Sequence, residues 1–309
     1  MDSFARLAAM ERREIIQERA IQMNVDFTIV EKDFWVCWTL KTLFDLPPGH
    51  AVLTFKGGTA LSKAYGLIAR FSEDIDIVTD PSFFIAEGSP DPEEPGITKT
   101  RRDERMSRLD DACAAYIGSA LLSALRDQFE ERLGTAGGWS ISQDTSDRNT
   151  LLFSYPKSDP DREHSYIRSV VKLELGWRAR TAPAEQRLIA PYLAEIPMLL
   201  QEPQVICNVL VPDRTFWEKV TALHAESFRD KPKQFFSRHY SDVAAMLQTR
   251  IEHLTILPCW KTSGSLRIST ITPRGLATTL RSRAHSSLFL GRRCFVSSRP
   301  IIGTCVRCF

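Results

Sequence analysis

Hydrophobic residues recur with regular spacing over most of this 309-residue chain. Helical spacing predicts helices over residues 8–23, 28–44, 59–67, 104–133, 214–228 and 238–249. Short apolar or alternating runs predict strands over 51–55, 73–78, 139–143, 150–155 and 168–177, and a further apolar run covers 205–211. Residues 80–103 have the Pro, Asp and Glu content of a surface loop, and 179–203 that of a linker with a short helix.

Residues 253–309 differ from the rest in both pattern and charge. They contain no Asp or Glu, and no helical or strand period is sustained there. Counting Lys, Arg, Asp and Glu, residues 1–252 carry a net charge of −7 and residues 253–309 carry +9. We interpret the tail either as a disordered basic segment or as coding sequence read out of frame, and assign it no function. The acidic body argues against broad, sequence-independent binding of nucleic acid.

The composition is that of an ordinary soluble protein, with 43% hydrophobic and 25% charged residues. No run of apolar residues is long enough for a membrane span, and the N-terminus lacks the design of a secretory signal, so a cytoplasmic location is expected. Cys305 and Cys308 have the CxxC spacing of a metal or redox pair. Because no second pair completes a zinc site, we predict no metal there.

The strongest chemical signal is the strand at 73–78. Side chains alternate along a strand, so Ile75 and Ile77 are expected to face the core while Asp74 and Asp76 share the other face. Two carboxylates on one strand face form a natural oxygen-ligand pair for Mg²⁺, which bridges triphosphate oxygens in phosphoryl and nucleotidyl transfer. Alone, such a pair is equally well explained as solvated aspartates at a strand edge.

A glycine turn precedes this strand and strengthens the interpretation. Gly57 and Gly58 end one expected strand and open a helix, where glycine permits close backbone approach and helix N–H groups can receive phosphate. Thr59 is expected to add a hydroxyl donor. Asp74 follows Gly58 by 16 positions, and the two motifs together are far more specific than either alone.

A third carboxylate is expected from the strand at 168–177. Val171, Leu173 and Leu175 alternate with Lys172 and Glu174. If this strand neighbours the one at 73–78, Glu174 meets the two aspartates and is a candidate general base or second metal ligand. The alternative is a surface strand with a paired Lys and Glu.

Two later helices carry further candidates. Asp213 is a good N-cap for a helix on which Lys219 lies beside the apolar stripe, and a lysine held there suits a triphosphate. The alternative is a surface lysine paired with an acid. Arg238 and Asp242 are four residues apart, so they form either an intrahelical ion pair or a site in which Asp242 orients Lys219 and Arg238 faces phosphate.

Four sequence blocks, taken in order, resemble the AbiEii/AbiGii toxin family of nucleotidyltransferases. They are KGGTALSKAYGLIARFSEDIDIV, VKLELGWR, RTFWEKVTALH and SRHYSDVAAML, within about residues 25–250. The resemblance implies an α+β, minimal nucleotidyltransferase fold, in which a small mixed sheet is flanked by helices, with a helical C-terminal half. It also implies the toxin half of a toxin–antitoxin or abortive-infection system, with Mg²⁺ as cofactor and an NTP as substrate. A tRNA 3′ end is the expected acceptor, and a cognate antitoxin is a further expected partner.

The resemblance also assigns residues and regions. Nucleotide contacts are expected from Gly57, Gly58, Thr59, Ser72 and Lys219. Catalytic roles are expected for Asp74, Asp76, Glu174, Lys219 and Asp242, with Asp74 and Asp76 as metal ligands. The nucleotidyltransferase core is expected over 1–182, a helical region completing the site over 183–252, and the atypical tail over 253–309.

Two other classes of function remain open from the residues. The chain is either the enzyme or a catalytically idle module that binds a nucleotide or a partner within a toxin–antitoxin system. A metal-dependent nuclease also uses clustered carboxylates, but it does not call for the Gly57–Gly58 turn and ranks last.

Overall fold

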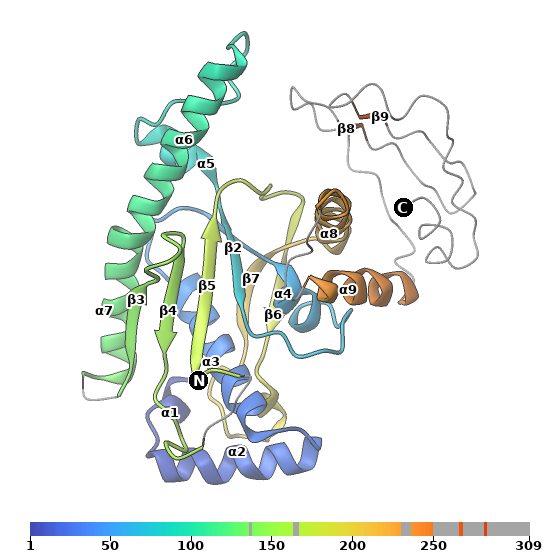
Figure 1. Cartoon of the computed structure of the whole chain (residues 1–309). Coiled ribbons are helices and arrows are strands. Elements are labelled where there is room, and N and C mark those ends of the chain that lie inside the picture. The colour runs from blue at the N-terminus through green and yellow to red at the C-terminus, as the bar shows by residue number, and fades with distance from the viewer. Residues whose placement is uncertain (136–137, 163–166, 230–235, 250–265, 268–280, 283–309) are drawn as a thin grey trace. The chain divides into compact units, whose positions relative to one another are not determined.

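The computed structural model describes residues 1–135, 138–162, 167–229, 236–249, 266–267 and 281–282 (Figure 1). The chain divides into two compact units, Met1–Val211 and Pro212–Phe309. Among the helices of the described residues, none combines the length and apolar character needed to cross a membrane.

The first unit is built around a seven-stranded mixed sheet. Its strands are β1 (Leu53–Lys56), β2 (Ile75–Thr79), β3 (Ser140–Gln143), β4 (Thr150–Ser154), β5 (Val170–Gly176), β6 (Ala184–Ile189) and β7 (Val205–Leu210). Their order across the sheet is β3-β4-β5-β2-β1-β7-β6. β2 pairs with β5, and β1 with β7, in parallel, whereas the other neighbours are antiparallel. The expected mixed sheet is confirmed.

Helices flank this sheet, as the sequence predicted. They are α1 (Asp2–Ala5), α2 (Ala9–Met23), α3 (Phe27–Phe44), α4 (Gly57–Lys63), α5 (Pro81–Ala86), α6 (Lys99–Tyr116) and α7 (Leu122–Leu133), with a π-helical turn η1 (Ile117–Leu121) and a 3-10 turn η2 (Tyr192–Glu195). α6, η1 and α7 follow one another without a break beside β3 (Figure 1). The helix predicted over 104–133 therefore begins earlier, at Lys99, where the hydroxyl of Thr98 caps it.

α3 is the central helix of the core. Asp26 is its N-cap, and the Asp26 carboxylate accepts the Thr28 N–H at 2.7 Å. Its apolar residues lie all around the helix, the pattern of a buried helix, and it packs against β5 and β7. Phe34, Trp35 and Trp38 are fully buried.

An aromatic cluster joins α3 to α7 and β4. Trp35 stacks on Tyr155 with ring centroids 5.5 Å apart, and Trp38 lies 4.9 Å from Phe129 of α7. Phe129 in turn lies 4.6 Å from Phe153 of β4. Such rings each bury a large apolar area, so this cluster is a main source of stability for the sheet and its helices.

Two expected irregular segments contain regular structure. The stretch predicted as a loop over 80–103 includes α5, because Asp80 accepts the N–H of Ser82 and Pro81 occupies the first helical position. The stretch predicted as a linker over 179–203 contains β6, which pairs along its whole length with β7. Its side chains from Glu185 to Leu188 are exposed, so the apolar alternation that would have indicated a strand is missing.

The second unit contains α8 (Pro212–Glu226), α9 (Ser237–Gln248) and two short antiparallel strands, β8 (Leu266–Arg267) and β9 (Arg281–Ser282). The helices predicted over 214–228 and 238–249 are confirmed. The first unit extends to Val211, beyond the boundary expected at residue 182, because β6 and β7 belong to its sheet. Most of the tail at 253–309 lies outside the described residues.

The aromatic cluster generates a stability prediction. Trp35→Ala removes a fully buried ring and is expected to lower the free energy of unfolding by about 3–5 kcal/mol, measured by urea denaturation. The control is Met10→Ala on α2, where the side chain is 73% exposed and the change is expected to stay within about 0.5 kcal/mol. Equal losses in the two variants would contradict the assignment of the cluster as a main source of stability.

Candidate functional site

The pleat of β2 separates its apolar and acidic residues. Ile75 and Ile77 are buried, with 0% and 2% of their surface exposed, and Asp76 between them is half-buried. Asp74 immediately precedes the strand and is also half-buried. The predicted alternation holds from Ile75 to Ile77, and it places the Asp76 carboxylate on the face of β2 opposite the core.

The parallel pairing of β2 with β5 brings in Glu174. Asp76 and Glu174 are direct partners in the register, so both side chains stand on the same face of adjacent strands. Glu174 also accepts a hydrogen bond from Lys172 Nζ at 2.5 Å, and these two side chains are 41% and 38% exposed. From sequence, Glu174 was expected either to lie beside the aspartates or to pair with Lys172 on a surface strand. The structure shows both: β5 neighbours β2, and Glu174 is paired with Lys172.

The charge of Lys172 reflects the acids around it. Burial alone would lower its pKa, but the hydrogen bond and charge of Glu174 raise the pKa above its ordinary value. Asp74 and Asp147 act in the same direction. Lys172 thus lies in a negative potential to which Glu174 and Asp74 both contribute.

Gly57 lies so close to Asp76 that no other residue fits. Its φ is +80°, and a Cβ built there would lie 1.9 Å from Asp76 Oδ2. Both the backbone conformation and the space therefore require glycine. The turn between β1 and α4 is held directly against one of the two carboxylates.

Gly58 allows a second close approach in the same turn. A Cβ at Gly58 would lie 2.9 Å from both Arg70 Nη2 and Ser72 Oγ. Ser72, expected to contact the nucleotide, is thus beside the turn. Arg70 brings a guanidinium to the same place, and Lys56 is the register partner of Asp76 across β1 and β2.

Sequence reasoning gave Arg70 and Lys56 no role. The available signal was their position: Lys56 stands directly before the glycine pair, and Arg70 stands four residues before Asp74.

Thr59 faces inward instead of toward a ligand. Its side chain is fully buried, and its hydroxyl donates to the backbone oxygen of Asp74 at 2.5 Å and lies 3.0 Å from Ser72 Oγ. The expected hydroxyl donor to phosphate is therefore engaged within the protein. Thr59 ties the first turn of α4 to the segment that carries the aspartates.

Asp74 and Asp76 fit a divalent cation by their donor chemistry. Mg²⁺ is commonly bound through one or two carboxylates, with substrate phosphates and waters completing its shell. The Asp76 carboxylate itself occupies the position that a Cβ at Gly57 would take, so the backbone of the glycine turn lies directly beside it. Among the described residues, no group of three or more His, Cys, Asp and Glu is arranged as a metal site, so the fit concerns the aspartate pair alone.

Lys219 and Asp242 form a buried ion pair within the second unit. Lys219 Nζ on α8 lies 3.0 Å from Asp242 Oδ2 on α9, and their side chains are 9% and 1% exposed. His239 Nδ1 is 3.5 Å from the same amine. Asp242 therefore contacts Lys219, as one of the two sequence-based alternatives for Asp242 expected, and Lys219 is paired with an acid but is buried instead of on the surface. Asp213, expected as the N-cap, lies in the first turn of α8, which begins at Pro212.

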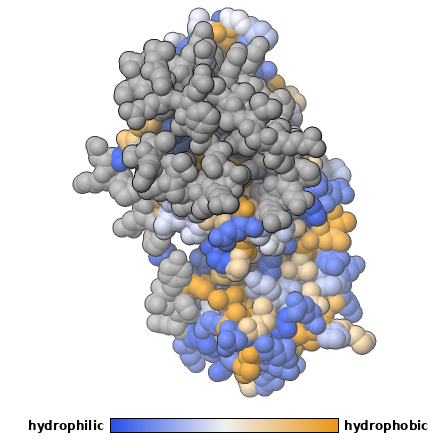
Figure 2. Space-filling model, turned by 90° about the vertical axis from the view of Figure 1, so that its right-hand side faces the viewer, coloured by the Kyte–Doolittle hydropathy of each residue, from blue (hydrophilic) through white to orange (hydrophobic). Residues whose placement is uncertain are grey.

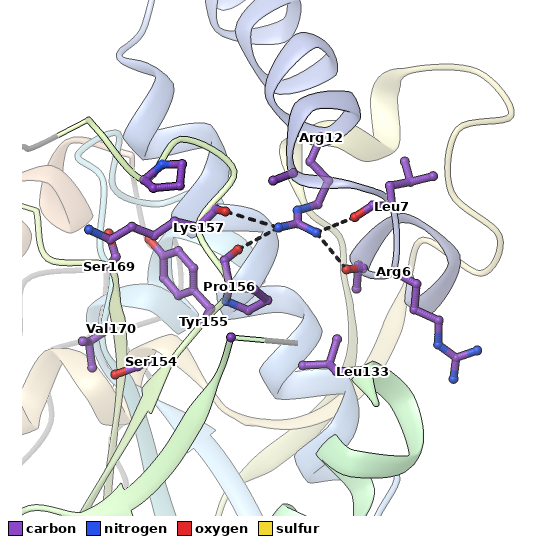
Figure 3. A pocket seen from close by; sticks show the side chains of 14 residues that line it. Arg6, Leu7, Arg12, Leu133, Ser154, Tyr155, Pro156, Lys157, Ser169 and Val170 are labelled. Atoms are coloured by element: carbon purple, nitrogen blue, oxygen red, sulfur yellow. Dashed lines mark hydrogen bonds between the residues drawn. The ribbon is translucent and has the colours of Figure 1, made fainter. Parts of the chain in front are cut away.

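A separate pocket of about 800 Å³ lies at the other end of β5 (Figure 3). Its lining includes Val170, four residues before Glu174, or roughly 13 Å along a strand at about 3.3 Å per residue. The Arg12 guanidinium at this pocket donates to backbone oxygens of Ala5, Leu7 and Pro156, at 3.2, 2.6 and 3.0 Å. Its donors serve to join loops of the chain, so we do not assign the pocket to the site.

The chain was also compared with known proteins. None of the curated proteins compared with the chain matches it. Among solved structures, the chain is similar to MenT4, a nucleotidyltransferase toxin from Mycobacterium tuberculosis, with a TM-score of 0.37 and 17% identity. That match covers 68% of this chain and 58% of MenT4.

The sequence profile described as "Nucleotidyl transferase AbiEii toxin, Type IV TA system" matches residues 38–264. This range includes the Gly57–Gly58 turn, Asp74, Asp76 and Glu174. It is most of the 309-residue chain, and it agrees with the resemblance drawn from the four sequence blocks. The chain therefore belongs to the AbiEii family of nucleotidyl transferase toxins of type IV toxin–antitoxin systems.

Proposed function

We propose that Asp74 and Asp76 hold Mg²⁺ and that the enzyme transfers a nucleoside monophosphate from an NTP to an acceptor hydroxyl, with the 3′ end of a tRNA as acceptor. The observation that carries this proposal is the close approach of Gly57 to Asp76. It brings the turn that opens α4 against a candidate metal ligand, which suits a substrate that carries both phosphates and a bound cation.

Different residues of the first unit are proposed to bind the triphosphate, the cation and the acidic segment. The backbone of Gly57 and Gly58 receives the triphosphate, and Arg70, whose guanidinium lies beside Gly58, neutralises part of its charge. Bound Mg²⁺ would polarise the phosphate oxygens and stabilise charge on the leaving group. Ser72 assists at the turn, whereas the inward Thr59 positions the aspartates.

Glu174 is proposed to act on the acceptor. It shares a strand face with Asp76, and its side chain is 41% exposed. As general base it takes the proton of the acceptor hydroxyl while the hydroxyl oxygen bonds to the α-phosphorus and the bond to pyrophosphate breaks. Lys172 donates a hydrogen bond to the Glu174 carboxylate, and because both side chains are partly exposed this bond is readily exchanged for one to the acceptor.

For Lys219 and Asp242 we propose a role in activity on chemical grounds. A compact ammonium suits the charge of a triphosphate, and a carboxylate 3.0 Å away orients it.

The proposed partners are an NTP, a tRNA and a cognate antitoxin. Because NTPs and tRNA occur together in the cytoplasm, we propose that the enzyme acts there. On the described part of the face in Figure 2, hydrophobic and hydrophilic side chains are interspersed.

The metal-binding role generates the first test of function. The purified protein is incubated with total RNA, Mg²⁺ and each α-labelled NTP in turn, and label on a discrete tRNA-sized species is expected. Asp76→Asn is expected to reduce the rate by at least about 100-fold, because the carboxylate charge that holds the cation is lost. Asp127→Asn, at an exposed position on α7, is the control and should label normally. NTP binding without transfer by the unaltered protein would contradict the enzyme and favour the idle binding module.

The glycine turn generates a second test. Gly57→Ala is expected to abolish labelling, because its Cβ would displace Asp76. Gly96 provides a matched control: it also has a positive φ, +86°, but nothing lies within 4 Å of its Cβ position. Gly96→Ala therefore carries the backbone strain without the collision and should remain active. Activity in Gly57→Ala would show that the Asp76 carboxylate has no fixed position relative to the turn.

A further inference from the structure

Three consecutive charged residues interrupt the apolar helix α3. Glu31, Lys32 and Asp33 are only 4%, 3% and 1% exposed. Burying a charge is costly unless it is paired and hydrogen-bonded, so each residue needs a partner. Each finds its partners outside α3, and the three sets of partners lie in different segments.

Lys32 holds the segments that lead into β2 and β5. Its Nζ lies 2.5 Å from Glu73 Oε2 and donates to the backbone oxygen of Arg168 at 2.9 Å. Glu73 directly precedes Asp74, and Arg168 lies two residues before β5. One buried amine thus joins the entries of the two strands whose register sets Asp76 beside Glu174.

Asp33 holds α4, the helix that begins at the glycine turn. Its carboxylate forms an ion pair with Lys63, the last residue of α4, and accepts the backbone N–H of Tyr192 at 2.6 Å. Lys63 also donates to the Ala190 oxygen at 3.2 Å and lies 3.8 Å from the Tyr192 ring centroid. α4 is therefore fixed at its far end to α3 and to the segment after β6.

Stability alone does not account for these pairs. Well-packed apolar side chains often stabilise a core as much as a buried ion pair does, whereas a pair fixes the relative position of its partners. The fit at Gly57 and Asp76 leaves little tolerance, because a Cβ there would be 1.9 Å from the carboxylate. A small displacement of either α4 or β2 would open or close this contact.

We propose that Lys32 and Asp33 are positioning residues, which fix the β2 aspartates and the Gly57–Gly58 turn relative to each other from adjacent places on α3. The inference rests on the proposed function for its activity readout. Metal binding gives an independent readout.

Glu31 provides a matched control on the same helix. It is equally buried, but its Oε1 accepts the N–H of Ser158 at 2.6 Å, in the loop next to the Arg12 pocket. Glu31→Gln therefore disturbs a buried charge on α3 without touching either part of the site. Lys32→Met and Asp33→Asn disturb the same helix at the contacts with Glu73 and Lys63.

The three variants are compared by melting temperature, by kcat and KM for nucleotide transfer, and by binding of Mn²⁺, used alone as the probe and followed by the EPR signal of the free ion. All three are expected to lower the melting temperature. Lys32→Met and Asp33→Asn are expected to reduce kcat by about tenfold to 100-fold, the effect of misplacing reacting groups by a fraction of an ångström to 1 Å. Lys32→Met should also weaken Mn²⁺ binding, whereas Glu31→Gln should keep wild-type kcat and Mn²⁺ affinity.

A milder variant tests the same contact in case Lys32→Met does not fold. Glu73→Gln removes the charge from the less buried partner, which is 29% exposed, and should reproduce the Lys32→Met effect. The double variant should be no worse than either single variant, because both remove one contact. Equal kcat and Mn²⁺ affinity in Lys32→Met and Glu31→Gln would overturn the inference. If the unaltered protein transfers no nucleotide, the proposed function fails, and Mn²⁺ binding alone then decides whether Lys32 positions the aspartates.

Discussion

The alternation of side chains along β2 is the constraint on which the rest of the site depends. Ile75 and Ile77 enter the core, and burial of each is worth about 1.5–3 kcal/mol, so the face that Asp76 occupies is strongly specified. A slip of one residue would bury the carboxylate and expose both isoleucines. With the register fixed, the pairing with β5 brings Glu174 beside Asp76, and the pairing with β1 brings the glycine turn there.

Close backbone approach is the second requirement, and it has a cost. Glycine loses more conformational freedom on folding than other residues, by roughly 0.5–1 kcal/mol relative to alanine. At Gly57 the structure nevertheless requires glycine, because φ is positive and the Asp76 carboxylate occupies the space of a Cβ. The buried charges of α3 have a similar character, since Lys32 and Asp33 are kept in a core that apolar residues would fill. Stability is given up at the places where the position of the aspartates and of the turn is set.

The parts of the fold that were predictable are those encoded locally. The period of two in β2 and β5 identified their faces, because each isoleucine or leucine alternates with an acid or a lysine. β6 was missed because its side chains are exposed and its pairing with β7 depends on residues distant in sequence. The inward turn of Thr59 and the partners of Lys32 were missed for the same reason: Asp74 and Arg168 reach them only through the tertiary fold. Three charges in an apolar helix were the available signal at α3.

Two lysine–acid pairs show why residue type alone does not define chemistry. Lys172 and Glu174 are 38% and 41% exposed, so water screens their attraction, and separating them costs little, about 0–1 kcal/mol for such pairs. Lys219 and Asp242 are 9% and 1% exposed, and separating them would leave an uncompensated buried charge. Glu174 is therefore suited to exchange its partner, whereas Asp242 is suited to hold Lys219 in place. Sequence spacing indicated the Lys172–Glu174 pair, whereas the contact of Asp242 with Lys219 was one of two alternatives, and only the structure distinguishes the two pairs by burial.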